Sequence, residues 1–192
     1  PVAYKAGRYG FGPNTTGILQ ELGFNIALSV CPPLDSRADG GPDYRRYDAR
    51  PFWFGGTAKP ILELPCTGGF IGWASAAAVP LFEAAQALRK FKAPGILSRL
   101  GAVDRLMLSP EGFTPSEHIK LTRALYDQGV RIFTWSFHSP SVVPGNTTYV
   151  RDDAQLRQFL ESFRRYFDFF FNELGGQAST PTRIRKLMET MA

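Results

Sequence analysis

Two kinds of hydrophobic pattern alternate along the chain: short runs rich in β-branched and aromatic residues, and longer stretches with apolar positions three and four apart. The short runs predict strands at residues 2–4, 25–30, 60–65, 102–108 and 130–137. The stretches between them predict helices at residues 14–22, 80–91, 96–100 and 114–128. About five mostly parallel strands with surrounding helices indicate an α/β fold, either a parallel sheet or part of a β/α barrel.

Two of the predicted helices carry start signals of their own. Residues 114–117, Thr-Pro-Ser-Glu, form a capping box with proline at the first helical position. Asp152 and Gln155 have the same spacing and predict the start of a long helix that ends at Gly175. The apolar residues of that helix form a wide stripe that we expect to pack in the core: Leu156, Phe159, Leu160, Phe163, Phe167, Phe170, Phe171 and Leu174.

The length of 192 residues predicts one main domain. We expect this domain to span residues 1–176 and a helical tail to span residues 177–192, with its helix at residues 181–189. Asn14 is expected to cap the first helix, and residues 68–69 are expected to form a glycine-rich turn.

A long irregular stretch, residues 31–59, separates two of the predicted strands. A connection of this length is usually functional or disordered. It mixes charged residues with aromatic residues such as Trp53, which suits a sugar-binding rim, but the stretch could equally fold down and bury its own aromatics. A calcium loop is excluded because Arg37 and Arg46 stand where carboxylate ligands are needed.

The composition excludes several classes of protein. The chain is 44% hydrophobic and 20% charged, which supports a folded core rather than disorder. The net charge is +5, and the basic groups have acidic or apolar neighbours, so we expect no nucleic-acid partner. No apolar stretch is long enough to predict a membrane span, and no signal-peptide pattern follows Pro1, so a cytoplasmic location is slightly favoured.

Two cysteines and one histidine lie at the ends of predicted strands. Cys31 and Cys66 each follow an apolar run, so their sulfurs would meet at one end of the sheet if the strands are neighbours, either as a disulfide or as two free thiols. No Cys/His spacing typical of zinc is present.

His138 follows the strand at residues 130–137, at the carboxyl end where catalytic groups gather. It can act there as an acid or a base, or simply bond to a loop.

Residues 4–12 read Tyr-Lys-Ala-Gly-Arg-Tyr-Gly-Phe-Gly, and residues 134–139 read Thr-Trp-Ser-Phe-His-Ser. Together these stretches resemble the third and fifth motifs of the polysaccharide deacetylases of the NodB-homology type, a carbohydrate esterase family. Residues 23–30 and 62–65 are similar to segments that lie between those motifs. The resemblance extends to about Gly175.

The resemblance implies a distorted β/α barrel and metal-dependent removal of N- or O-acetyl groups from sugar polymers. In this family a divalent metal, commonly zinc, activates water, an aspartate takes the proton of that water, and a histidine protonates the leaving group. The acid role maps to His138. The candidate substrate-binding residues are Lys5, Arg8, Tyr9, Trp53 and Trp135.

Parts of the family pattern have no counterpart in this chain. It contains no H-x-x-x-H pair and no early pair of aspartates, and Lys5 stands where the family has an arginine. We therefore expect an amino-terminally truncated, partial barrel without a metal site of its own, and weak or absent deacetylase activity. The alternatives are a non-catalytic carbohydrate-binding remnant, or a different hydrolase or esterase with Ser136 or Ser139 as its nucleophile.

A partial barrel would leave one edge of its sheet without a neighbouring strand. Unpaired strand edges favour association with another chain. We therefore expect a homo-oligomer that covers the edge, with a flap from the long irregular stretch as the alternative.

Overall fold

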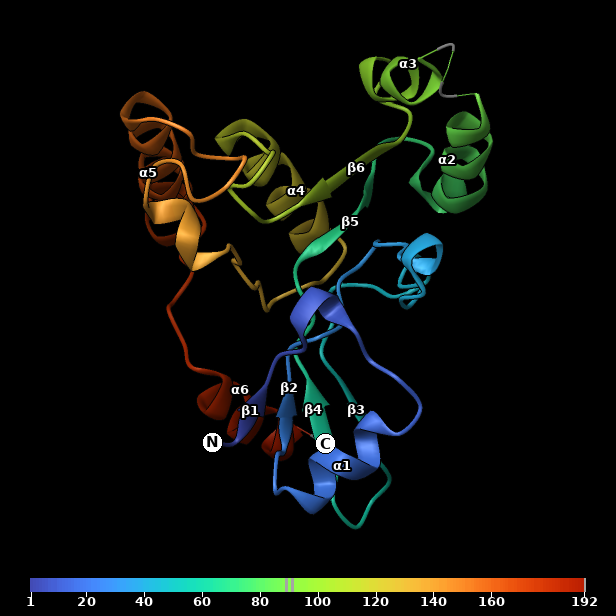
Figure 1. Ribbon diagram of the computed structural model, residues 1–192, viewed down its shortest axis with the longest axis vertical. Coiled ribbons are helices and arrows are strands. Elements are labelled where there is room, and N and C mark those ends of the chain that lie inside the picture. Colours follow the sequence, from blue (N-terminus) through green and yellow to red (C-terminus); the bar gives the residue numbers. More distant parts are fainter. Residues whose placement is uncertain (89, 91, 192) are drawn as a thin grey trace.

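The computed structural model describes residues 1–88, 90 and 92–191. The strands form a four-stranded mixed sheet and a separate two-stranded pair (Figure 1). In the first sheet, with the order β1-β2-β4-β3, the parallel strands are β1 (Ala3–Tyr4), β2 (Ile26–Ala27) and β4 (Ile61–Glu63). Strand β3 (Phe52–Phe54) pairs with β4 in the antiparallel direction. The second sheet pairs β5 (Gly68–Ile71) with β6 (Asp104–Met107), also antiparallel.

The helices flank these two sheets (Figure 1). They are α1 (Thr15–Glu21), α2 (Ala78–Ala87), α3 (Ala93–Arg99), α4 (Pro115–Asp127), α5 (Asp153–Asp168) and α6 (Pro181–Met191). Helix α5 continues into a π-helical turn, Phe169–Glu173. None of the helices in the described part of the chain has the length and apolar character needed to cross a membrane.

Both faces of the four-stranded sheet are covered by helices. On one face, Ile61 packs with Leu19 of α1. On the other face, Ile26 and Leu62 pack with Ile184 of α6. Because successive residues of a strand point to opposite faces, β2 and β4 are apolar on both sides and read as continuous hydrophobic runs in the sequence.

The second sheet packs against α4 and α5 through a larger core. Leu106 of β6, Leu121 of α4 and Phe169 after α5 are buried in it. The ring of Trp135 stacks on the ring of Tyr166, with 4.5 Å between their centroids. The apolar stripe of α5 therefore packs largely as the sequence predicts, although Leu160 is 50% exposed.

The predicted helix starts are confirmed in two of three cases. The Thr114 hydroxyl accepts the amide of Glu117 while the Glu117 carboxylate accepts the amide of Thr114. Asp152 accepts the amide of Gln155 at 2.8 Å. The prediction for Asn14 is wrong, since its side chain makes no capping bond and its backbone is already helical.

The strand predicted at residues 130–137 is wrong. This part of the described chain is extended but is assigned to no strand. It makes isolated bonds, from the Ser136 amide to the Leu108 carbonyl (3.2 Å) and from the Thr134 amide to the Thr67 hydroxyl (2.7 Å). The alternation of large apolar residues there reflects the burial of Phe133 and Trp135 against the core rather than strand pairing.

Two further local predictions are wrong. Residues 68–69 do not form a turn but begin β5, and a Cβ at Gly68 would collide with the carbonyl oxygen of Pro32. The long stretch at residues 31–59 is not wholly irregular, because Phe52–Phe54 forms β3. Tyr44 is buried, the three aromatic residues of β3 are half-buried and Tyr47 is exposed, so part of the stretch folds down onto the core.

The architecture is mixed α/β, with parallel and antiparallel strand pairs. The long stretch supplies β3, which covers the edge of β4, while β1 forms the opposite edge of the sheet. A partial NodB-type barrel, a homo-oligomer that covers the β1 edge, and a division of the chain at residue 176 stay predictions.

Arg185 of α6 connects the last helix to the first sheet. Its guanidinium donates to the carbonyls of Asn25 (2.5 Å) and Pro60 (3.2 Å) and lies 4.8 Å from the centre of the Trp53 ring. We expect Arg185→Met to lower the free energy of unfolding by about 1–3 kcal/mol, because two partly buried carbonyls lose a charged donor. Urea unfolding checks this, with the exposed Arg183→Met as the matched control. Equal stability of the two variants would contradict the prediction.

Candidate active site

His138 is held by a buried carboxylate from another part of the chain. Its Nδ1 lies 2.6 Å from Oε2 of Glu111, and its backbone amide donates to Oε1 of Glu111 at 3.0 Å. The hydroxyl of Ser141 also donates to Oε1, at 2.5 Å. The side chain of Glu111 is 6% exposed, whereas that of His138 is 65% exposed. The contacts thus fix the ring on one side and leave it open to solvent on the other.

The carboxylate determines which nitrogen of His138 carries a proton. An ionised carboxylate only accepts hydrogen bonds, so Nδ1 is the donor and Nε2 of the neutral ring carries the lone pair. A histidine oriented in this way can take a proton at Nε2, and the carboxylate stabilises the cation that forms. The histidine–glutamate pair, His138 and Glu111, therefore has the geometry of a general acid–base group.

The other histidine has a structural role. His118 is fully buried in α4 and donates from Nε2 to the carbonyl of Ser109 at 2.7 Å. Burial lowers the pKa of His118, which keeps the ring neutral. Because Ser109 lies two residues before Glu111, this bond anchors the loop that presents the carboxylate.

A second group of polar side chains gathers at the carboxyl ends of the strands. We define the strand-end cluster as Lys5, Tyr9, Cys31, Cys66 and Ser136. Lys5 Nζ lies 3.3 Å from Sγ of Cys66, 3.1 Å from the carbonyl oxygen of Leu28 and 5.1 Å from the centre of the Tyr9 ring. The prediction that the ends of the two cysteine strands meet is confirmed, and both cysteines are free thiols.

The strand-end cluster and the histidine–glutamate pair are neighbours along the chain and in space. Ser136, two residues before His138, lies close enough to Cys66 to contribute to the lowered pKa of that thiol. Tyr9 lies close enough to Glu111 for the carboxylate to contribute to its raised pKa, although burial is the largest cause of that rise. The phenol of Tyr9 consequently stays protonated at neutral pH and can donate a hydrogen bond.

The predicted substrate-binding residues lie in three places. Lys5 and Tyr9 lie in the strand-end cluster, and the exposed Arg8 lies between them with a left-handed backbone (φ 53°). Trp53 lies on the face of the sheet that α6 covers, beside Arg185. Trp135 packs in the aromatic core against α5. The structure thus brings three of the five candidates together at the strand ends.

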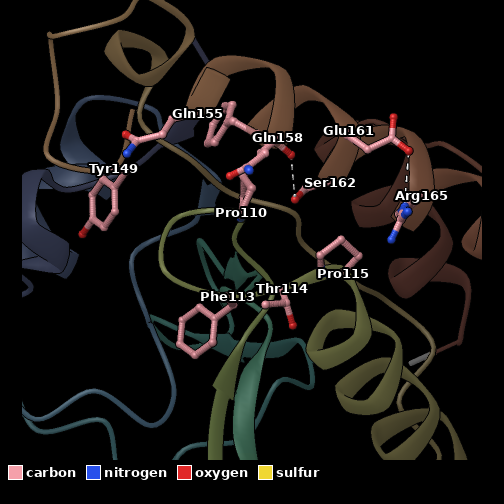
Figure 2. A pocket seen from close by; sticks show the side chains of 11 residues that line it. Pro110, Phe113, Thr114, Pro115, Tyr149, Gln155, Gln158, Glu161, Ser162 and Arg165 are labelled. Atoms are coloured by element: carbon pink, nitrogen blue, oxygen red, sulfur yellow. Dashed lines mark hydrogen bonds and ion pairs between the residues drawn. The ribbon is translucent and has the colours of Figure 1, made fainter. Parts of the chain in front are cut away.

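A cavity of about 530 Å³ opens between α5 and the loop that follows β6 (Figure 2). Pro110, next to Glu111, and Phe113 form one side of it, and Gln158 of α5 lines the other. Tyr149 stands at one end, and the ion pair between Glu161 and Arg165 stands at the other (Figure 2). Aromatic surface with amides and charges nearby is the lining that suits a sugar.

Comparison of the chain with known protein families, with curated proteins and with solved structures found no match. The site therefore has to be interpreted from its own geometry.

The described residues do not fit a divalent metal. Within the described parts of the chain, no three side chains of His, Cys, Asp or Glu come together in a way that could hold such an ion.

Sequence reasoning missed Glu111, although a usable signal was present. The residue stands shortly after the strand predicted at residues 102–108, at the same kind of strand end that singled out His138. Its partner Ser141 gave no such signal, because the turn that brings its hydroxyl to Glu111 forms only in the folded chain.

Glu63 is a buried carboxylic acid at the end of β4. Its Oε1 accepts the amide of Val30 at 2.8 Å, while Oε2 is buried and has no hydrogen-bond partner among the described residues. Burial raises the pKa of Glu63 to about 7, against the bonds from the backbone amides of Val30 and Ser29, which lower it.

This raised pKa predicts a pH-dependent stability. Between about pH 4.5 and 7 the unfolded chain releases the Glu63 proton more readily than the folded chain, so the free energy of unfolding falls as the pH rises, by up to about 3 kcal/mol. Glu63→Gln cannot titrate, so its stability relative to the parent should rise across this window and level off above it.

Urea unfolding at several pH values checks this expectation. Glu21→Gln, at an exposed position of α1, is the matched control and should show a constant difference from the parent. A Glu63→Gln difference that is equally constant from pH 4 to pH 8 would show that Glu63 ionises normally in the folded chain.

Proposed function

We propose that the chain is a polysaccharide deacetylase-like hydrolase that acts on acetylated sugars, with His138 as its acid–base group. The observation that carries the proposal is the 2.6 Å contact between His138 Nδ1 and the buried carboxylate of Glu111. This contact orients the ring so that Nε2 faces the exposed side, where a substrate can approach. The resemblance of residues 4–12 and 134–139 to deacetylase motifs supports the same class of reaction.

The proposed reaction uses the two nitrogens of His138 differently. Nε2 takes a proton from the water that attacks the acetyl carbonyl and then gives it to the departing sugar oxygen or nitrogen. Glu111, bonded at Nδ1, stabilises the imidazolium between these two transfers. Lys5 and the phenol of Tyr9, at the nearby strand ends, are the proposed donors to the substrate.

The cavity between α5 and the loop after β6 is the proposed site for the sugar. Pro110 lines the cavity and is joined directly to Glu111, so a sugar held there would lie beside the loop that orients His138. Phe113 and Tyr149 offer apolar ring surface, and Gln158 offers an amide. Carbohydrate binding without catalysis is the second candidate, and it rests on the same cavity.

A serine nucleophile finds little support in the geometry. The Ser141 hydroxyl is buried and donates to Glu111 rather than to the His138 ring. Among the described residues, no hydrogen bond joins the hydroxyl of Ser136 or Ser139 to the His138 ring, whose partner is Glu111. Acid–base catalysis by His138 is therefore preferred over a serine-based acyl transfer.

The proposal predicts that His138→Ala lowers the hydrolysis of acetylated oligosaccharides or aryl acetates by about two to four powers of ten, the usual contribution of a general acid–base group. Glu111→Gln should cause a smaller loss, because the ring keeps Nε2 but loses the charge that stabilises its cation. Acetate release at fixed pH measures both effects, with Glu21→Gln as the control.

The two candidate functions give different results with the same variants. Unchanged acetate release by His138→Ala would overturn the catalytic proposal. Saturable oligosaccharide binding by calorimetry, with no acetate release from the parent chain, would favour the binding function. Loss of that binding in Tyr149→Ala would locate it in the cavity.

A further inference from the structure

Cys31 and Cys66 lie side by side at the ends of two neighbouring parallel strands. In β2 and β4, Ala27 stands opposite Glu63, and the pairing continues as the amide of Cys66 donates to the carbonyl of Val30 at 2.9 Å. The two cysteines are buried in the same cluster, and each thiol affects the pKa of the other. The backbone thus holds two thiols in contact without a disulfide between them.

The surroundings give the two thiols different roles. The Lys5 ammonium lies 3.3 Å from the sulfur of Cys66. The interaction with the neighbouring Cys31 thiol and the charge of Lys5 lower the pKa of Cys66, against the effect of burial. The interaction with Cys66 and burial raise the pKa of Cys31. Cys66, beside the ammonium, is therefore the sulfur whose thiolate form the surroundings favour.

Cys66 lies beside an exposed residue. Lys5 is exposed as a residue, whereas Cys66 is 1% exposed and lies 3.3 Å from the Lys5 ammonium. The route considered for a water-sized oxidant is therefore past the Lys5 ammonium.

We propose that Cys66 and Cys31 are a peroxide-reactive pair that closes to a reversible disulfide. The Cys66 thiolate attacks one oxygen of hydrogen peroxide, the O–O bond breaks, and hydroxide leaves, so that Cys66 becomes a sulfenic acid. The sulfur of Cys31 then attacks the sulfur of Cys66, the S–O bond breaks, and the thiol proton leaves with the hydroxyl as water. Both sulfurs are oxidised, one peroxide is reduced, and a dithiol reductant reverses the change.

The reaction does not depend on the proposed hydrolase activity, because it involves neither His138 nor Glu111.

The pH dependence of the reaction of Cys66 is set by the titratable groups near it, which are Lys5, Tyr9, Cys31, Tyr44 and Glu63. Among them, Lys5 favours the thiolate through its positive charge, and an ionised Glu63 opposes it. The rate is therefore expected to depend on Lys5.

The proposal is tested by treating the reduced chain with hydrogen peroxide. Dimedone traps any sulfenic acid, and the remaining thiols are counted after denaturation. The parent chain should lose both thiols together and regain them with dithiothreitol. Cys31→Ser should accumulate the dimedone adduct at Cys66, and Cys66→Ser should keep Cys31 reduced. The proposal would be overturned if both thiols stayed reduced in the folded chain and reacted only after urea unfolds it. Oxidation of Cys66→Ser at the parent rate would also overturn it.

Lys5→Gln tests the role of the ammonium. The variant should raise the pKa of the Cys66 thiol, and once that pKa lies above 7 each further unit should lower the rate of oxidation at pH 7 by about ten-fold. Lys59→Gln, at another exposed lysine, should oxidise at the parent rate. Equal rates of oxidation for the two variants would show that the Lys5 ammonium does not promote the reaction. The rate–pH profile of the parent is an independent measurement, and a midpoint at or above that of an ordinary cysteine would contradict a stabilised thiolate.

Discussion

The parallel pairing of β2 with β4 is the contact on which the rest of the structure depends. It places Ile26 beside Leu62 on the face that α6 covers and Ala27 beside Glu63 on the other face. Because the two strands run in the same direction, the residues that follow them emerge at the same end of the sheet. Lys5 reaches this end from β1, and the extended segment that carries His138 passes close to it.

Signals confined to a few consecutive residues could be recognised in the sequence. The capping boxes at Thr114 and Asp152 need only four residues each, and both form as predicted. Strand pairing depends on distant partners, and here the sequence was less informative. Residues 130–137 have the composition of a strand, but their side chains pack against α5 while most of their backbone has no neighbouring strand.

The candidate site shows the same difference between local signals and contacts between distant residues. His138 could be found from the sequence because a histidine at the end of an apolar run stands out. Its partner Glu111 follows a predicted strand in the same way but was missed, and its contact with His138 depends on a loop that His118 anchors through Ser109. The contact between Lys5 and Cys66 likewise joins residues 61 positions apart.

The position of α6 has a consequence for the order in which the chain can fold. Ile184 and Arg185 cover the sheet that residues 3–63 begin, and more than a hundred residues are synthesised between the two. As the chain leaves the ribosome, Ile26 and Leu62 therefore remain open to water until residues 184–185 have been made. Contacts between such distant parts of a chain form slowly. During this interval, the exposed apolar strands offer a binding site to a chaperone that shields such surfaces.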